Sequence, residues 1–279
     1  MRVAVLSGKG GAGKTFTAVN LAVGAGRSVY VDCDVEEPNG RLFLQPEQTE
    51  TRKVFTLVPS FDPARCTGCR ACVDFCRFNA LIYIKEQPML FPEICHSCGG
   101  CALVCPEHAV TEIQRPVGIL ELGHRGDVKT ITGVLNQGEA SGVPVIQAAL
   151  DESRKDSRFT VIDCPPGSAC SVMESVQGAD FCLLVAEPTA FGFHNFRMVQ
   201  ELVSLLHKPH AVIINKADRE PYEPLEQFLT DRNIPVWARI PYDPEVAAVC
   251  SDGGLAYEKV PSIRRTIDSL LERLGGEAR

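Results

Sequence analysis

A run near the N-terminus, Gly8 to Thr15, constrains the fold more than any other stretch of the sequence. It fits the phosphate-binding pattern G-x-x-x-x-G-K-[ST]. Residues 2–6 before it indicate a short buried strand, and residues 16–25 after it indicate a helix. In this context glycines let the backbone N–H groups face an anion at the positive end of the helix dipole. The unit predicts an α/β chain that binds a phosphorylated ligand.

The motif assigns chemistry to its residues by position. Lys14 should reach the β- and γ-phosphates, and the Thr15 hydroxyl should ligate Mg²⁺. The remaining nucleotide-binding positions are Gly8, Gly10, Gly11, Ala12, Gly13 and Phe16.

Carboxylates follow two further apolar runs. Asp34 follows the run 28–32, and Asp163 ends the run 159–163. Ligands bind at the carboxyl ends of strands in open α/β sheets, so both side chains should face the nucleotide. An apolar strand that ends in aspartate is the Walker B arrangement, and its carboxylate holds Mg²⁺. The alternatives are a turn cap for Asp34 and a helix N-cap for Asp163.

Composition limits the function classes. The chain has 279 residues, a formal net charge of −7 and no basic block, which gives no support to nucleic-acid binding. No apolar run approaches the roughly 18 residues of a membrane span. The N-terminus enters a strand after one arginine, which leaves no room for a signal peptide, so we expect a cytoplasmic protein without stable membrane insertion.

Eight of the 13 cysteines form two tight runs. Each run has the spacing C-x₂-C-x₂-C-x₃-C, and the second repeats the first at an offset of 29 residues; their cysteines are Cys66, Cys69, Cys72 and Cys76, then Cys95, Cys98, Cys101 and Cys105. Disulfides are typical of small secreted chains, so metal binding is the better interpretation. Zinc uses C-x₂-C pairs but needs neither the third cysteine nor the C-x₃-C step.

The duplicated runs resemble a bacterial ferredoxin with two [4Fe–4S] clusters. In that arrangement the fourth cysteine of each run ligates the other cluster. The resemblance implies Cys66, Cys69, Cys72 and Cys105 on one cluster, and Cys95, Cys98, Cys101 and Cys76 on the other.

The loop with its early second lysine, Lys9, resembles the deviant Walker A motif of MinD/ParA/Mrp ATPases and the nitrogenase iron protein. The resemblance implies an ATP-dependent homodimer in which Lys9 reaches the partner's nucleotide. It also implies that Asp34 orients the attacking water and that Asn215 contacts adenine. Asn215-Lys216-Ala217-Asp218 also fits the N-K-x-D signature of guanine-specific GTPases. We favour ATP, and the choice of base stays open here.

The resemblance covers nearly the whole chain. Residues 1–58 and 116–279 should form a doubly wound, mostly parallel sheet, and residues 59–115 an inserted α+β ferredoxin-like domain. Within the former we expect an edge strand near 54–58, a strand at 117–122 followed by a polar, glycine-rich stretch to Gly142, and a C-terminal helix packed on the core.

Two functions fit these features. One is an ATPase whose nucleotide state gates electron transfer through two [4Fe–4S] clusters to a protein partner. The other is an ATP-dependent iron–sulfur or metallocofactor assembly protein that passes its cargo to a client. Complete ferredoxin ligation and the lack of a C-terminal C-x-x-C pair favour the redox function. Cys170, seven residues after Asp163, resembles in position a bridging cysteine of the nitrogenase iron protein, but inert packing is its better interpretation.

Overall fold

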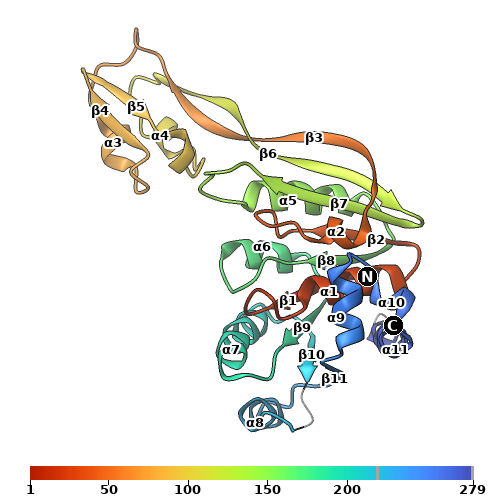
Figure 1. Cartoon of the computed structure of the whole chain (residues 1–279). Helices are drawn as coiled ribbons and strands as arrows, with labels where there is room; N and C mark the ends of the chain where they lie inside the picture. The colour runs from red at the N-terminus through yellow and green to blue at the C-terminus, as the bar shows by residue number, and fades with distance from the viewer. Residues whose placement is uncertain (218–219, 278–279) are drawn as a thin grey trace.

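The protein is built on a nine-stranded sheet with the strand order β11-β10-β9-β1-β8-β2-β7-β6-β3 (Figure 1). The computed structural model describes residues 1–217 and 220–277. Neighbouring strands from β11 to β7 are parallel, whereas β6 and β3 join in antiparallel pairs. The predicted α/β fold with a mostly parallel sheet is therefore confirmed.

The sheet strands are β1 (Arg2–Ser7), β2 (Ser28–Asp32), β3 (Glu47–Phe61), β6 (Val110–Arg125), β7 (Val128–Leu135), β8 (Phe159–Asp163), β9 (Phe181–Ala186), β10 (His210–Ala217) and β11 (Val236–Pro241). The helices that accompany them are α1 (Lys14–Gly24), α2 (Gly40–Leu44), α5 (Val143–Arg154), α6 (Cys170–Gln177), α7 (Ala190–Leu205), α8 (Glu223–Asp231), α9 (Pro244–Ser251), α10 (Ala256–Lys259) and α11 (Pro261–Glu277).

Helices cover both faces of the parallel strands. Successive side chains of a strand point to opposite faces, so each strand contributes to two cores. On β2, Val29 and Val31 join the core formed with α5 to α8, whereas Tyr30 joins the core formed with α1, α10 and α11. Strands buried on both sides explain the uninterrupted apolar runs that the sequence shows.

The C-terminal helix packs as predicted. Its apolar face places Ile263, Ile267, Leu270 and Leu274 in the core shared with α1. Across the described residues, we find no helix with the length and apolarity needed to cross a bilayer.

The stretch between the predicted strand 117–122 and Gly142 is a correction to the sequence analysis. It contains β7, whose residues Val128 to Leu135 form a ladder between β2 and β6. Threonines and Gly133 make this strand look polar, and its burial comes from the two neighbouring strands. The predicted edge strand is also longer than expected, because β3 runs from Glu47 to Phe61 at the edge of the sheet.

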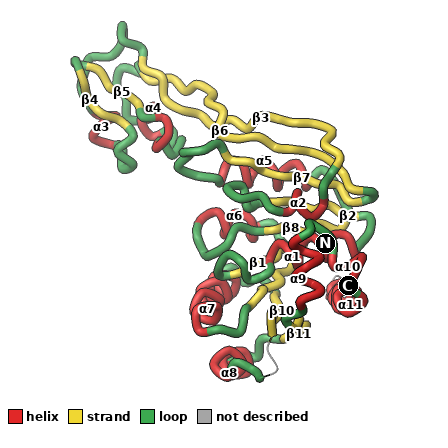
Figure 2. The backbone as a smooth tube through the Cα atoms, viewed as in Figure 1, coloured by secondary structure: helices red, strands yellow, loops and turns green. Residues whose placement is uncertain are grey.

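Strands β3 and β6 continue beyond the sheet as a long antiparallel arm (Figures 1 and 2). Between them lies the insert, residues 62–109, with α3 (Ala71–Phe75), the hairpin β4 (Leu81–Ile84) and β5 (Gln87–Leu90), the short 3₁₀ turn η1 (Pro92–Ile94), and α4 (Gly100–Leu103). The proposed domain limits at 58/59 and 115/116 fall inside the two arm strands and stay a prediction.

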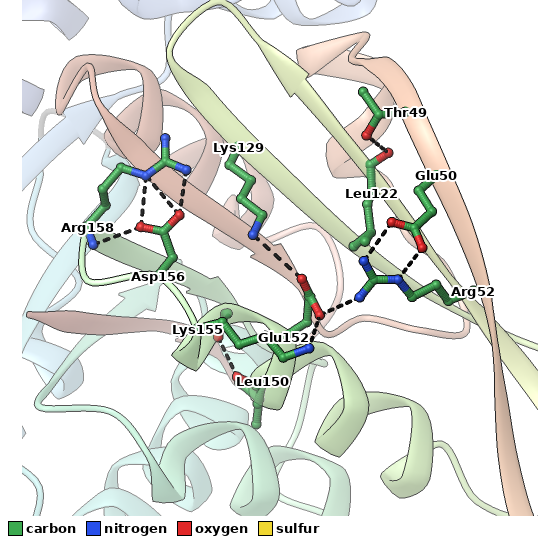
Figure 3. A network of polar contacts seen from close by, with 11 residues as sticks. Thr49, Glu50, Arg52, Leu122, Lys129, Leu150, Glu152, Lys155, Asp156 and Arg158 are labelled. Atoms are coloured by element: carbon green, nitrogen blue, oxygen red, sulfur yellow. Dashed lines mark hydrogen bonds and ion pairs between the residues drawn. The ribbon is translucent and has the colours of Figure 1, made fainter.

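The base of the arm is held to the body by charge (Figure 3). Glu152 of α5 is almost buried and accepts hydrogen bonds from Arg52 of β3 and from Lys155, both at 2.7 Å. Lys129 of β7 lies 3.7 Å from its second oxygen. Burial alone would raise the pKa of Glu152, but the three cations outweigh it and the pKa is lowered. The network therefore joins β3, β7 and α5.

Candidate nucleotide site and cysteine cavities

The carboxyl ends of four parallel strands bring the predicted nucleotide residues together. The phosphate loop follows β1, Asp163 ends β8, Asp34 follows β2, and Asn215 lies on β10. These ends meet at one edge of the sheet because the strands are parallel. A cleft of about 1010 Å³ lies at this edge. Its lining includes Lys9, Gly10, Gly11, Gly13, Lys14, Thr15, Phe16 and Asp34, whereas Gly8, Ala12, Asp163 and Asn215 are not part of it.

Lys14 is the buried cation of this cleft. Its Nζ lies 2.7 Å from Asp163 Oδ1 and 3.3 Å from Asp34 Oδ2, and its side chain is only 6% exposed. Burial alone would lower the pKa of Lys14, but the carboxylates of Asp163 and Asp34 outweigh it and the pKa is raised. The lysine therefore stays charged, and the γ-phosphate of a nucleotide can take over the place of these carboxylates.

Asp34 is the carboxylate that both lies beside Lys14 and borders the cleft, which Glu36 and Glu37 of the same segment also line. Its side chain is 18% exposed and borders the cleft, whereas Asp163 is fully buried behind Lys14. Burial raises the pKa of Asp34, and Lys14 opposes this rise. A carboxylate placed beside the phosphate loop can orient a water molecule, and phosphoryl transfer needs little more from a protein than such positioning and charge stabilisation.

Tyr30 is a site residue that the sequence analysis missed. Its hydroxyl donates to Asp163 Oδ2 at 2.8 Å and lies 3.4 Å from Asp32 Oδ2. Asp32 also accepts from the Gly40 N–H at 3.0 Å. Burial, together with the nearby Asp163, raises the pKa of Asp32 to about 8. No spacing in the sequence signals this contact, because it crosses from β2 to β8.

Lys9 is held within its own subunit. Its Nζ lies 2.7 Å from Glu187 Oε2, an ion pair without hydrogen-bond alignment, and 5.5 Å from the Phe191 ring. Lys216 approaches the same carboxylate oxygen at 3.7 Å. No pattern in the sequence marks Glu187, which follows β9 at the edge of the sheet where the phosphate loop lies.

Asn215 and Lys216 bind the phosphate loop. Asn215 Nδ2 donates to the Ala12 carbonyl at 2.8 Å, and Lys216 Nζ donates to the Gly11 carbonyl at 2.8 Å. In this state the Asn215 amide is engaged with the loop, and its contact with adenine stays a prediction. Asp218, the last member of the possible GTPase signature, lies outside the described residues.

The eight cysteines of the two runs border two cavities in the insert. One is lined by Cys66, Cys69, Cys72 and Cys105, and the other by Cys76, Cys95, Cys98 and Cys101. In each cavity, three cysteines come from one run and the fourth from the other. The fold thus brings together the same two sets of four that the ferredoxin resemblance implies.

The two cavities differ in size and surroundings. The first is tight, about 20 Å³, and the second is about 190 Å³. The rings of Phe78 and His96 stack at 3.8 Å beside the second. Burial raises the pKa of Cys101 to about 11, so a metal that binds this thiol must displace its proton.

The four thiols around each cavity match the donor set of an iron–sulfur cube. Within residues 1–217 and 220–277, no three histidine, cysteine or acidic side chains converge on a single metal ion. The other cysteines lie elsewhere: Cys33, Cys164 and Cys182 are buried, Cys250 is half-buried, and Cys170 is exposed at the start of α6.

Comparison with known proteins agrees with this geometry. The CobQ/CobB/MinD/ParA nucleotide binding domain matches residues 3–255. The chain therefore belongs to the CobQ/CobB/MinD/ParA family of nucleotide-binding domains and is a P-loop ATPase of the MinD/ParA type.

Two relatives resemble nearly the whole chain, and a third resembles a short part of it. Uncharacterized protein MJ0578 of Methanocaldococcus jannaschii is 27% identical over 280 residues, covering 98% of this chain and 96% of that protein. The septum site-determining protein MinD of Pyrococcus horikoshii, solved with Mg-ADP, shares the fold with a TM-score of 0.62 and 18% identity, covering 99% and 97% of the two chains. Uncharacterized ferredoxin MJ0722 of M. jannaschii is 36% identical over 53 residues, 18% of this chain and 69% of that protein.

Proposed function

We propose that this protein is an ATPase whose nucleotide state controls electron transfer through two [4Fe–4S] clusters in the insert. The observation that carries the proposal is the pair of cavities, each lined by three cysteines of one run and one cysteine of the other. The short similarity to a ferredoxin supports the same occupant. When bound, the clusters would supply one-electron transfer, and the cysteine thiolates would hold them.

The ATPase half would act on Mg²⁺·ATP in the cleft. Lys14 and Thr15 would bind phosphate and metal, and Asp163 would hold the Mg²⁺ shell. Asp34 would orient the attacking water, since its carboxylate borders the cleft and lies 3.3 Å from Lys14 Nζ. In the homodimer we propose, Lys9 leaves Glu187 and contacts the nucleotide of the partner subunit.

The test is metal analysis of protein purified anaerobically. We expect about eight iron atoms and eight acid-labile sulfides per chain. A Cys105→Ser variant should lose one cluster, whereas a matched Cys250→Ser variant, outside both cavities, should keep the full iron content. Stoichiometric zinc with little iron would refute the proposal.

A transfer assay separates the redox function from cofactor assembly. The iron-loaded protein is mixed with an apo-ferredoxin acceptor and a chelator, with and without ATP. Clusters that stay on the protein and cycle with dithionite support electron transfer. Prompt ATP-dependent transfer of iron to the acceptor would contradict it and favour the assembly function.

A further inference from the structure

The segment that bears Asp34 is locked to the end of β7. Val35, the next residue, sits in a notch between Gly133 and Gly142. A Cβ built on either glycine would lie 2.7 Å from a Val35 methyl carbon, so neither position has room for a side chain. The Val35 carbonyl also accepts a hydrogen bond from the Leu135 N–H at 2.9 Å. Close packing of this kind transmits displacement, because no space exists to absorb it.

From β7 the chain continues into a loop, residues 136–142, that is bonded to the arm. The Asn136 N–H donates to the Val117 carbonyl at 2.9 Å, and its side chain donates to the Pro116 carbonyl at 3.2 Å. Glu139 accepts a hydrogen bond from Arg115 at 2.6 Å. The side chains of Arg115 and Glu139 are 20% and 7% exposed, so this is a part-buried ion pair at the junction of body and arm.

The same loop touches the insert beside the second cysteine cavity. The Ala140 N–H donates to the Glu93 carbonyl at 3.1 Å, and Glu93 lies two residues before Cys95.

We propose that the loop 136–142 connects the nucleotide cleft with the second cysteine cavity, and that the Arg115–Glu139 ion pair couples this loop to the arm. The loop begins at β7, where Val35 is bonded, and ends at Gly142, which lines the cleft. The inference rests on the proposed function for the occupant of the cavity. Arg115 and Glu139 are positioning residues. They transmit a displacement of the Asp34 segment to the insert and do not contact the nucleotide.

The arm also meets the body at its base. There β3 is fixed to α5 by the ion pairs of Glu152 with Arg52 and Lys155 (Figure 3). None of these three residues lines the cleft, whereas Gly142 at the end of the loop does. We therefore place the connection in the loop.

Hydrogen–deuterium exchange of the anaerobic protein tests the connection. We compare the free protein with the protein saturated by Mg²⁺ and the non-hydrolysable analogue AMPPNP. In the unsubstituted chain, AMPPNP should change exchange in residues 93–101 by about fivefold or more, the lower end of ordinary coupling free energies. In Glu139→Gln this response should fall to below about twofold, while protection of the phosphate loop is kept.

A matched control comes from β6, the strand that carries Arg115. Glu121 of β6 pairs with Arg41 at 3.2 Å, away from the loop, so Glu121→Gln should respond like the unsubstituted chain. If Glu139→Gln loses protection of the phosphate loop, Ala140→Pro tests the connection instead. It removes the N–H bonded to Glu93 but leaves both side chains of the ion pair in place. That variant should also lose the response of residues 93–101.

The connection is overturned if residues 93–101 ignore AMPPNP in the unsubstituted chain, or if both variants respond in full. Iron content is measured on the same samples. A protein without iron whose insert still responds through Glu139 would overturn the iron–sulfur proposal and support the connection. A protein with full iron content whose residues 93–101 do not respond to AMPPNP would overturn the connection and support the iron–sulfur proposal.

Discussion

Removal of one hydroxyl tests whether the buried carboxylates behind the cleft depend on Tyr30. In Tyr30→Phe, Asp163 Oδ2 loses its 2.8 Å donor while the ring keeps its place in the core. A hydrogen bond to a charged group contributes about 1.5–3 kcal/mol, and its loss leaves a buried carboxylate oxygen unsatisfied. Asp163 and Tyr30 are both fully buried, so water cannot replace the donor. We therefore expect the upper part of that range.

Urea unfolding followed by circular dichroism measures this loss. For a slope of about 2 kcal/mol per M, the midpoint of the nucleotide-free protein should fall by about 1.1–1.5 M with the slope unchanged. Tyr257→Phe is the matched control, because the Tyr257 hydroxyl donates to Asp268 at 3.0 Å in a part-buried, water-accessible position. Its effect should stay within about 0.5 kcal/mol. Equal midpoints for the two variants would refute the reasoning.

Three further outcomes are expected. Lys14→Ala should abolish nucleotide binding by calorimetry, whereas Lys9→Ala should bind normally but lose dimer-dependent hydrolysis; normal ATPase rates in the latter would disprove the role of Lys9. Asp32 has a folded-state pKa of about 8 against 3.8 for an unperturbed aspartate, so the folded state holds an extra proton between these values. The stability of the nucleotide-free protein should therefore fall as pH rises from about 4 to 8, by at most about 1.4 kcal/mol per pH unit. Asp32→Asn should flatten that dependence in urea midpoints, and an unchanged slope would contradict it. In Cys105→Ser the iron content should fall by about half, since one of two cubes loses a ligand, and full occupancy would contradict the grouping.

Much of the nucleotide site could be predicted because its information is local. The strand, loop and helix around Lys14 are contiguous, and the apolar run 159–163 ends in its aspartate within five residues. Where parallel strands end, the topology alone places such residues at one edge. The grouping of the cysteines is what the ferredoxin resemblance implies, and the domain limits predicted with it cut through two continuous strands.

What escaped the sequence lies between elements. The sequence of residues 128–135 is typical of a polar stretch. Its threonines and glycine are buried because β7 lies between β2 and β6. Glu187 gave no signal either, since its partner Lys9 is distant in the chain and was interpreted only toward a second subunit.

By itself, the sequence determined the strand, loop and helix around Lys14, the α/β class and the spacing of the two cysteine runs, since each depends on short-range pattern. Only the tertiary structure decided which charges meet. Tyr30 and Asp163 are 133 positions apart and touch because β2 and β8 are neighbours in the sheet. Glu139 and Arg115 meet because the loop after β7 folds back on β6. Such pairs follow from strand order and register, which no local propensity encodes.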